Sequence, residues 1–190
     1  KLDFAVLHEK CPDMELLDLS FNKVSTVEAT HWPNHLAKFY LAGNSIKELD
    51  VKKLPTTLII FDVGGSDVTM GSSIGNREEV ESRSSNNELD EIDFASMKQW
   101  DRLMILDASH NKIDRFDERN VPKSCIAIFA AQNNLTAFKP KLLGCEGLQI
   151  LDLSNNRNIT AFDSTCLPPA LRILNLYNNA LEHFDTSKLP

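Results

Sequence analysis

One short pattern recurs along the chain and constrains the fold more than any other feature. The pattern is L-x-x-L-x-L-x-x-N-x-L, in which an asparagine follows three regularly spaced apolar residues. The asparagine place, filled once by serine, falls at Asn22, Asn44, Ser66, Asn111, Asn133, Asn156 and Asn179. These positions are separated by 22, 22, 45, 22, 23 and 23 residues. A pattern repeated at a nearly fixed period predicts a solenoid, in which each repeat packs only on its neighbours.

The centre of each copy alternates apolar and other residues, as in Leu17-Asp18-Leu19. Such alternation predicts a short strand with one buried face, and stacked repeats place these strands side by side in a parallel sheet. The asparagine side chain both donates and accepts hydrogen bonds, so we expect it to satisfy backbone groups inside the turn that follows. We therefore predict a structural asparagine ladder made of Asn22, Asn44, Asn111, Asn133, Asn156 and Asn179.

Each repeat also contains a return segment with one further apolar residue, such as Phe116 or Phe138. A period of 22–23 residues is too short for a long helix, so we expect short 3-10 or extended turns there. Four repeats carry a proline eleven residues before the asparagine place, at Pro33, Pro55, Pro122 and Pro168. Proline there fits an extended approach to the strand, because its φ is fixed and no ladder donor is needed yet.

Together these features resemble the leucine-rich repeat family over nearly the whole chain. The resemblance implies an α/β solenoid, a horseshoe fragment with about seven short parallel strands on its concave face and short 3-10 or extended turns on its convex face. We take residues 1–190 as a single such domain. The proline before the strand is similar to the receptor-like repeats of oomycetes and other protists. Because Leu2 and Leu189-Pro190 are in phase with the repeats, we expect a fragment of a longer array.

The step of 45 residues indicates an insertion. An eroded repeat in the gap would have only Val80 as an apolar residue at its five template positions, so we reject a further strand. We predict an insertion over residues 71–100, made of an acidic loop rich in Ser, Glu and Asn and a short helix from Glu88 to Trp100 capped by Asn87. It is either functional or a surface insertion tolerated at small entropic cost.

The composition excludes several functions. A net charge of −7 argues against binding to nucleic acid through its phosphates. No apolar run approaches the ~20 residues that a membrane span requires. There is no glycine-rich phosphate loop with a following lysine and no nucleophile-elbow serine, so we predict that the chain is not an enzyme. We also expect no cofactor and no metal, since aspartates on separate strands do not converge as hard-cation ligands do.

We expect the concave face to carry the candidate binding residues. They occupy the position between the two core residues of each strand, with one more tyrosine near the last strand: Asp18, Tyr40, Asp62, Asp107, Phe129, Asp152, Asn175 and Tyr177. Large aromatic side chains often dominate interface energy, which favours a protein-binding module with a basic protein partner. The aspartates can equally be a generic feature of such strands. A structural spacer in a larger assembly, or a regulatory or recognition domain of an enzyme such as a receptor-like kinase, remain alternatives.

The cysteines and two glycosylation sequons give further expectations. Cys125 fills a leucine place and should be a reduced core residue, whereas Cys145 and Cys166 are the one pair placed for a disulfide. Asn134-Leu135-Thr136 and Asn158-Ile159-Thr160 match the sequon, although a chain of this composition contains about two matches by chance. We favour an extracellular or cell-surface location over the cytoplasm. The sequence does not determine the oligomeric state.

Overall fold

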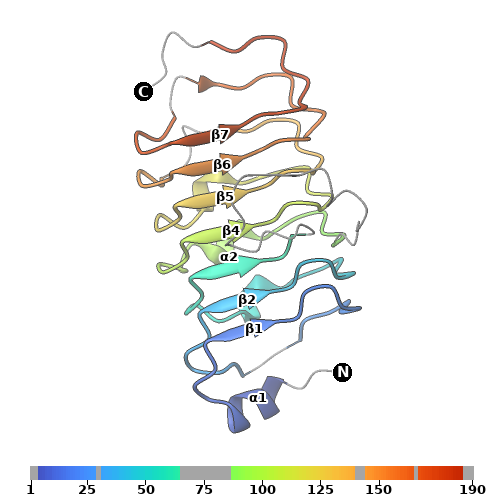
Figure 1. The fold of residues 1–190 in the computed structure, drawn as a ribbon, viewed down its shortest axis with the longest axis vertical. Coiled ribbons are helices and arrows are strands. Elements are labelled where there is room, and N and C mark those ends of the chain that lie inside the picture. Colours follow the sequence, from blue (N-terminus) through green and yellow to red (C-terminus); the bar gives the residue numbers. More distant parts are fainter. Residues whose placement is uncertain (1–3, 29–30, 65–86, 140–143, 165–166, 186–190) are drawn as a thin grey trace.

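The computed structural model describes residues 4–28, 31–64, 87–139, 144–164 and 167–185. Seven parallel strands form one sheet in chain order from β1 to β7, as Figure 1 shows. The strands are β1 (Leu16–Asp18), β2 (Lys38–Tyr40), β3 (Ile60–Asp62), β4 (Ile105–Asp107), β5 (Ala127–Phe129), β6 (Ile150–Asp152) and β7 (Ile173–Asn175). The predicted solenoid with a parallel sheet is therefore confirmed.

Each strand lies directly beside its successor without a shift in register. Phe39 of β2 is opposite both Leu17 of β1 and Phe61 of β3, and Leu106 of β4 is opposite Phe61. These central residues point into the solenoid, where Phe39, Phe61 and Leu106 are fully buried. No repeat encloses a core of its own, so burial of each central residue depends on the repeats above and below.

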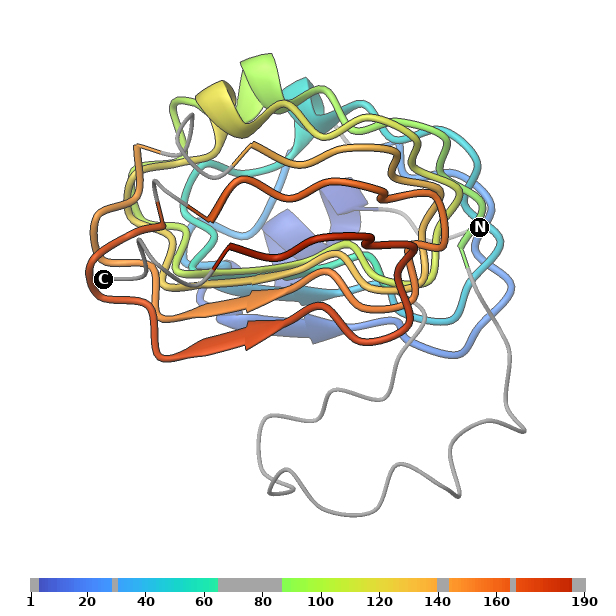
Figure 2. The ribbon, with the colours of Figure 1, turned by 90° about the horizontal axis from the view of Figure 1, so that it is seen from above.

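The helices on the return side of the solenoid, opposite the sheet, are short in the part of the chain that the structure describes (Figure 2). They are η1 (Val51–Lys53), α2 (Phe94–Met97) and η3 (Glu118–Asn120). A further helix, α1 (Phe4–Lys10), lies at the N-terminal end of the stack, below β1 in Figure 1. This confirms the expectation of short 3-10 and extended returns. Phenylalanine rings of successive repeats contact one another in a tilted arrangement on this side, with ring centroids 4.3 Å apart for Phe94 and Phe116 and 5.3 Å apart for Phe116 and Phe138.

The long third repeat departs from the prediction. β3 pairs directly with β4, so no additional strand lies between them in the described residues. However, Asn87 takes the asparagine place that the sequence pattern assigned to Ser66, which lies outside the described residues. The Asn87 amide donates to the backbone oxygens of Leu41 and Val63 at 3.0 and 2.8 Å, as the other ladder asparagines do. The additional residues therefore lie between Gly64 and Asn87.

This placement also corrects the predicted helix. Asn87 does not cap a helix, and α2 covers only Phe94–Met97, with the Asp93 side chain accepting from the backbone of Ser96. Leu89 and Trp100, which were assigned to the insertion, are fully buried and belong to the return of the third repeat. Residues 71–86 of the predicted insertion lie outside the described part of the chain.

The prolines before the strands open turns and do not continue an extended segment. The carbonyl oxygens of Pro33, Pro122 and Pro168 each accept the backbone N–H three residues later, at 3.0–3.2 Å. A fixed φ near −65° suits the start of a tight turn as well as an extended chain. The return segment therefore bends sharply immediately before each of these strands.

Candidate functional site

The asparagine ladder fixes how one repeat sits on the next. The side chain of Asn111, for example, donates to Val63 of the preceding repeat at 3.1 Å and to its own Ala108 at 3.2 Å. Its Oδ1 atom accepts the backbone N–H of Leu89 in the preceding repeat at 3.0 Å. The same arrangement holds for Asn44, Asn87, Asn133 and Asn156. Four of the predicted ladder residues and Asn87 are therefore buried side chains that hold neighbouring turns together.

The ladder is incomplete at its two end rungs. Asn22 is exposed and donates only within its own turn, to Leu19 and Ser20. Asn179 donates to Leu153 and Leu176, but its Oδ1 atom is buried without a hydrogen-bond partner among the described residues.

The sixth repeat has one additional residue before its next core residue, Ile159. The Ile159 N–H therefore turns back to the Asn156 carbonyl, whereas the equivalent N–H in other repeats reaches the next asparagine.

The residue before six of the ladder asparagines, those other than Asn87, adopts a left-handed backbone. The φ angle is 62° at Gly43 and 52–59° at five residues that are not glycine: Phe21, His110, Gln132, Asn155 and Asn178. Residues other than glycine rarely take this conformation, so it must be imposed by the surrounding contacts. Here the backbone N–H groups of five of these residues donate to the neighbouring repeat at 2.7–3.0 Å: Phe21, Gly43, His110, Gln132 and Asn155.

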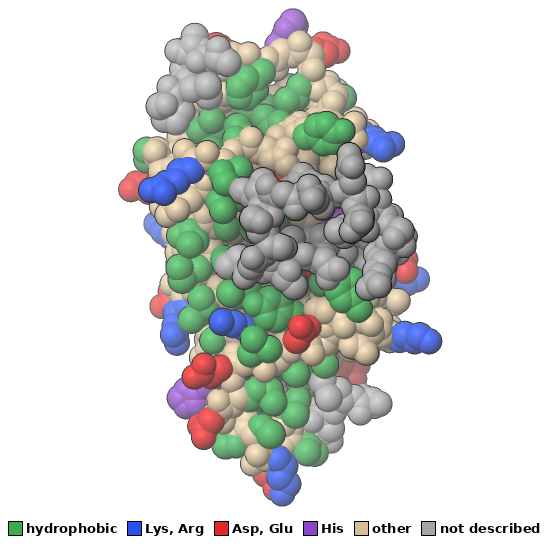
Figure 3. Space-filling model, viewed as in Figure 1, with side chains coloured by type: hydrophobic (Ala, Val, Ile, Leu, Met, Phe, Trp, Pro, Cys, Tyr) green, Lys and Arg blue, Asp and Glu red, His purple; other side chains and the backbone are tan. Residues whose placement is uncertain are grey.

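The exposed face of the sheet, here called the sheet face, carries the predicted binding residues in register. The acidic row comprises Asp18, Tyr40, Asp62, Asp107, Phe129, Asp152 and Asn175, each beside the next across the sheet. A parallel aliphatic row comprises Leu16, Lys38, Ile60, Ile105, Ala127, Ile150 and Ile173. Hydrophobic side chains gather along this face of the molecule (Figure 3).

Most of the acidic row has a structural role that sequence reasoning left open. One carboxylate oxygen of Asp62 accepts the backbone N–H of Gly64 at 2.8 Å, which closes the turn at the end of β3. The same bond to the residue two positions on is made by Asp18, Asp107, Asp152 and Asn175, at 2.8–3.1 Å. Tyr40 and Phe129 cannot make this bond. The interpretation of the aspartates as a generic feature of such strands therefore holds for the one carboxylate oxygen of each that closes the turn.

Seven parallel strands in register, six left-handed turns and five buried ladder asparagines in the described part of the chain decide the family. The chain is a leucine-rich repeat array. A profile of the Leucine Rich Repeat family matches residues 147–172, which include β6. A search of curated protein sequences found no match for the chain.

Two solved leucine-rich repeat structures are similar to the array. YopM from Yersinia enterocolitica is 17% identical with a TM-score of 0.54, over 94% of this chain and 41% of that one. The functional domain of InlJ from Listeria monocytogenes, which includes a cysteine ladder, is 19% identical with a TM-score of 0.44, over 92% of this chain and 42% of that one. The array therefore spans about two-fifths of the length of each protein. At these identities the likeness to YopM shows the fold alone.

Exposure divides the candidate residues of the leucine-rich repeat array into three groups. Asp62, Asp107 and Asp152 are buried, whereas Tyr177 is 71% exposed. Asp18 is also exposed, and Tyr40, Phe129 and Asn175 are half-buried. Sequence reasoning did not name several exposed apolar side chains as binding residues. They include Leu16, Phe21, Met104 and Ile173. Leu16 and Ile173 could have been found from their places in the aliphatic row.

The buried carboxylates change the electrostatics of the sheet face. Burial, and next the neighbouring Asp107 carboxylate, raise the pKa of Asp62 to about 8. Burial and then the charges of Asp62 and Asp18 raise the pKa of Tyr40. Two carboxylates on adjacent strands repel one another when both are ionised, which favours the protonated form of one of them. The acidic row therefore carries less negative charge at neutral pH than its sequence implies.

Gly64 sits against this carboxylate pair. A Cβ atom on Gly64 would lie 2.7 Å from Oδ1 of Asp107 and 3.1 Å from the backbone oxygen of Ser109. Both distances are below ordinary van der Waals contact. Only glycine therefore fits at the end of β3 without displacing the Asp107 side chain.

The cysteine expectations have different outcomes. Cys125 is a free, fully buried thiol, which confirms the predicted reduced core residue. Cys145 is also free and buried, and its Sγ donates to the carbonyl of Pro122 at 3.2 Å. The predicted bridge between Cys145 and Cys166 is therefore not formed. Cys166 itself lies outside the described residues, and Cys11 is exposed.

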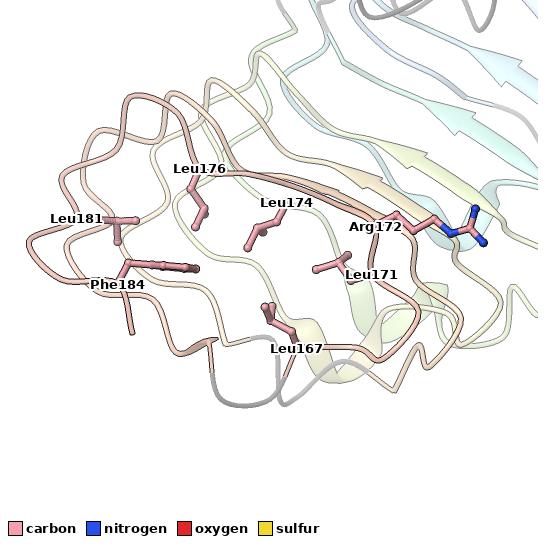
Figure 4. Close-up of a pocket in the computed structure, with 7 residues that line it drawn as sticks. All are labelled: Leu167, Leu171, Arg172, Leu174, Leu176, Leu181 and Phe184. Carbon is pink, nitrogen blue, oxygen red and sulfur yellow. The ribbon is translucent and has the colours of Figure 1, made fainter. Parts of the chain in front are cut away.

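The remaining features of the described chain do not add a chemical site. A hollow of about 510 Å³ opens at the last repeat, and Figure 4 shows Leu167, Leu171, Leu174, Leu176, Leu181 and Phe184 lining it, with Arg172 directed away. Six of the seven lining residues are apolar, so the hollow lies at the end of the core that the described repeats form. Within the described ranges, no three His, Cys, Asp or Glu side chains gather as metal ligands. None of the described helices has the length and hydropathy to cross a membrane.

Proposed function

We propose that the array is a protein-interaction module whose partner binds to the sheet face. The observation that carries this proposal is the exposure of large apolar side chains on that face. Leu16 at 49% and Ile173 at 38% occupy aligned strand positions, and Tyr177 at 71% lies two residues beyond β7. Short strands in unshifted register hold these side chains at fixed spacing. A partner that docks on them orders few groups on this side of the interface, which reduces the entropic cost of association.

Tyr40 and Phe129 are the proposed central contacts. At the same position in the other five strands, an aspartate or asparagine side chain accepts a backbone N–H and closes the turn. Tyr40 and Phe129 do not make that hydrogen bond, and each places a half-buried ring on the sheet face. Aromatic rings with a half-buried base offer contact area at little conformational cost, as interface hot spots do.

The charge of the array favours a basic partner. The chain has a net charge of −7, and Asp18 is exposed beside Leu16. A cationic side chain docked against Asp62 would stabilise its ionised form and lower its raised pKa. Binding below about pH 8 should then release a proton from this site, and the association rate should fall with added salt.

A position-specific crosslink tests the location of the site. A photoreactive phenylalanine analogue replaces Tyr177 in one variant and Arg115, 92% exposed and outside the strands, in a matched control. A protein crosslinked from Tyr177 but not from Arg115 is identified by mass spectrometry and purified. Its affinity is then measured for the native array and for the double variant Tyr40→Ala, Phe129→Ala.

The expected result is a loss of affinity of at least tenfold in the double variant, with association that slows as salt is added. A second variant lacks residues 71–86 and retains Asn87, because Asn87 is a rung of the ladder. If that deletion abolishes binding and the double variant binds normally, the sheet face is not the site. If no crosslink depends on position, the alternative of a structural spacer is favoured.

A further inference from the structure

The two sequons occupy comparable places in successive repeats. Asn134 directly follows the ladder residue Asn133, and Asn158 lies two residues after Asn156. In both, the first and third residues are exposed, while the middle residue, Leu135 or Ile159, is fully buried. The asparagine and threonine of each sequon therefore face solvent together at the edge of the solenoid beyond the strands.

Asn134 is held in the stack of repeats. Its backbone N–H donates to Ile113 of the preceding repeat at 2.9 Å, as expected for a residue in the regular ladder. Its side-chain nitrogen, the atom to which a glycan would be attached, lies 3.4 Å from the backbone oxygen of Lys112. That nitrogen is directed at the neighbouring repeat, so a sugar attached to it would have to replace this contact.

Asn158 is placed differently because of the additional residue in the sixth repeat. The Ile159 N–H donates to the Asn156 carbonyl at 3.0 Å, which closes a turn with Arg157 and Asn158 at its corner. Both corner residues are exposed. Among the described residues, the Asn158 side chain makes no hydrogen bond. The bulge thus presents the Asn158 amide to solvent while Ile159 anchors the turn in the core.

We infer that Asn158 is an N-glycan acceptor and that Asn134 is not the principal one. The donor would be an oligosaccharide linked through pyrophosphate to a lipid. The Asn158 Nδ2 atom attacks the first sugar carbon, so an N–C bond forms and the C–O bond to pyrophosphate breaks. The lipid pyrophosphate leaves, and the amide proton passes to a base of the transferase. The Thr160 hydroxyl completes the recognised sequon.

This assignment has a consequence for location and for binding. Only a chain that enters the secretory pathway or a comparable compartment meets such a donor, which agrees with the expected extracellular or cell-surface location. A glycan on Asn158 would stand outside β6 and β7 and leave the sheet face open. The inference does not depend on the proposed partner.

Site-specific mass spectrometry tests it. The full chain is produced behind a secretion signal in a eukaryotic host, and both the secreted and the cell-retained pools are treated with peptide N-glycosidase in heavy-oxygen water. We expect labelled conversion of residue 158 to aspartate in most molecules. Asn158→Gln and Thr160→Ala should abolish the modification, Thr160→Ser should retain it, and Asn134→Gln should leave it unchanged.

Three outcomes would overturn the inference. The first is an unmodified residue 158 in both pools, and the second is a glycan found mainly at Asn134. The third is an unmodified residue 158 in the protein isolated from its natural source. Because Thr160→Ser keeps the hydroxyl, its behaviour separates loss of the sequon from misfolding of the turn.

Discussion

The asparagine ladder predicts a graded loss of stability, largest inside the stack. Asn111→Ala removes the one acceptor that the described residues offer to the buried Leu89 N–H, and it removes one donor to Ser109. The carbonyls of Val63 and Ala108 keep a second donor, because Asn87 and Asn133 also bond to them. One orphaned buried donor costs about 1–3 kcal/mol, so with the smaller losses we expect a decrease of about 3 kcal/mol in the free energy of unfolding.

Asn22→Ala is the matched control. Asn22 is exposed and bonds only within its own turn, so we expect a loss below about 1 kcal/mol. Urea unfolding followed by circular dichroism gives both values, and coincidence with tryptophan fluorescence checks that the array unfolds in one step. Hydrogen exchange at Leu89 should accelerate in Asn111→Ala. Equal losses in the two variants, within about 0.5 kcal/mol, would refute the ladder argument.

Three further predictions concern the sheet face and the core. Gly64→Ala should destabilise the array by about 1–3 kcal/mol, because the added Cβ atom would overlap the Asp107 carboxylate. Gly147→Ala is the control, because its Cβ atom would meet open space and the change should be nearly neutral. Urea unfolding measures both variants. Because the pKa of Asp62 is raised in the folded state, ionisation of Asp62 lowers the free energy of unfolding as the pH rises from 4 to 8. The free energy of unfolding of Asp62→Asn should therefore equal that of the native array at pH 4 and exceed it by about a few kcal/mol at pH 8. An equal effect of the substitution at both pH values would contradict this. Cys11 is exposed and Cys125 fully buried, so a thiol reagent should label Cys11 rapidly and Cys125 only on unfolding, and rapid labelling of both under native conditions would contradict the buried assignment.

The repeat pattern determined the architecture of this protein by itself. A single repeat cannot bury its own apolar residues. A chain of such repeats buries them by stacking each repeat on the next in chain order. For that reason the seven strands, their parallel order and the short returns were predictable. The roles of Asn111 and Cys125 were also predictable, since each occupies a defined place in the template.

Only the tertiary structure decided which asparagine completes the third repeat. Asn87-Glu88-Leu89 repeats the local pattern of Asn44-Ser45-Ile46, so a signal was present in the sequence. Ser66, however, fits the regular period of 22 residues, and local spacing could not choose between them. The choice depends on hydrogen bonds from Asn87 to residues 23–46 positions away, which exist only when the repeats are stacked.

The tertiary structure also decided which residues of the acidic row are exposed. The sequence places Asp18 and Asp107 at the same template position. Asp18, on the edge strand β1, remains exposed, whereas Asp107, in the middle of the sheet, is buried. Exposure and the raised pKa of Asp62 result from the neighbours of a side chain across the sheet. A template read along one repeat contains no information about those neighbours, because they belong to other repeats.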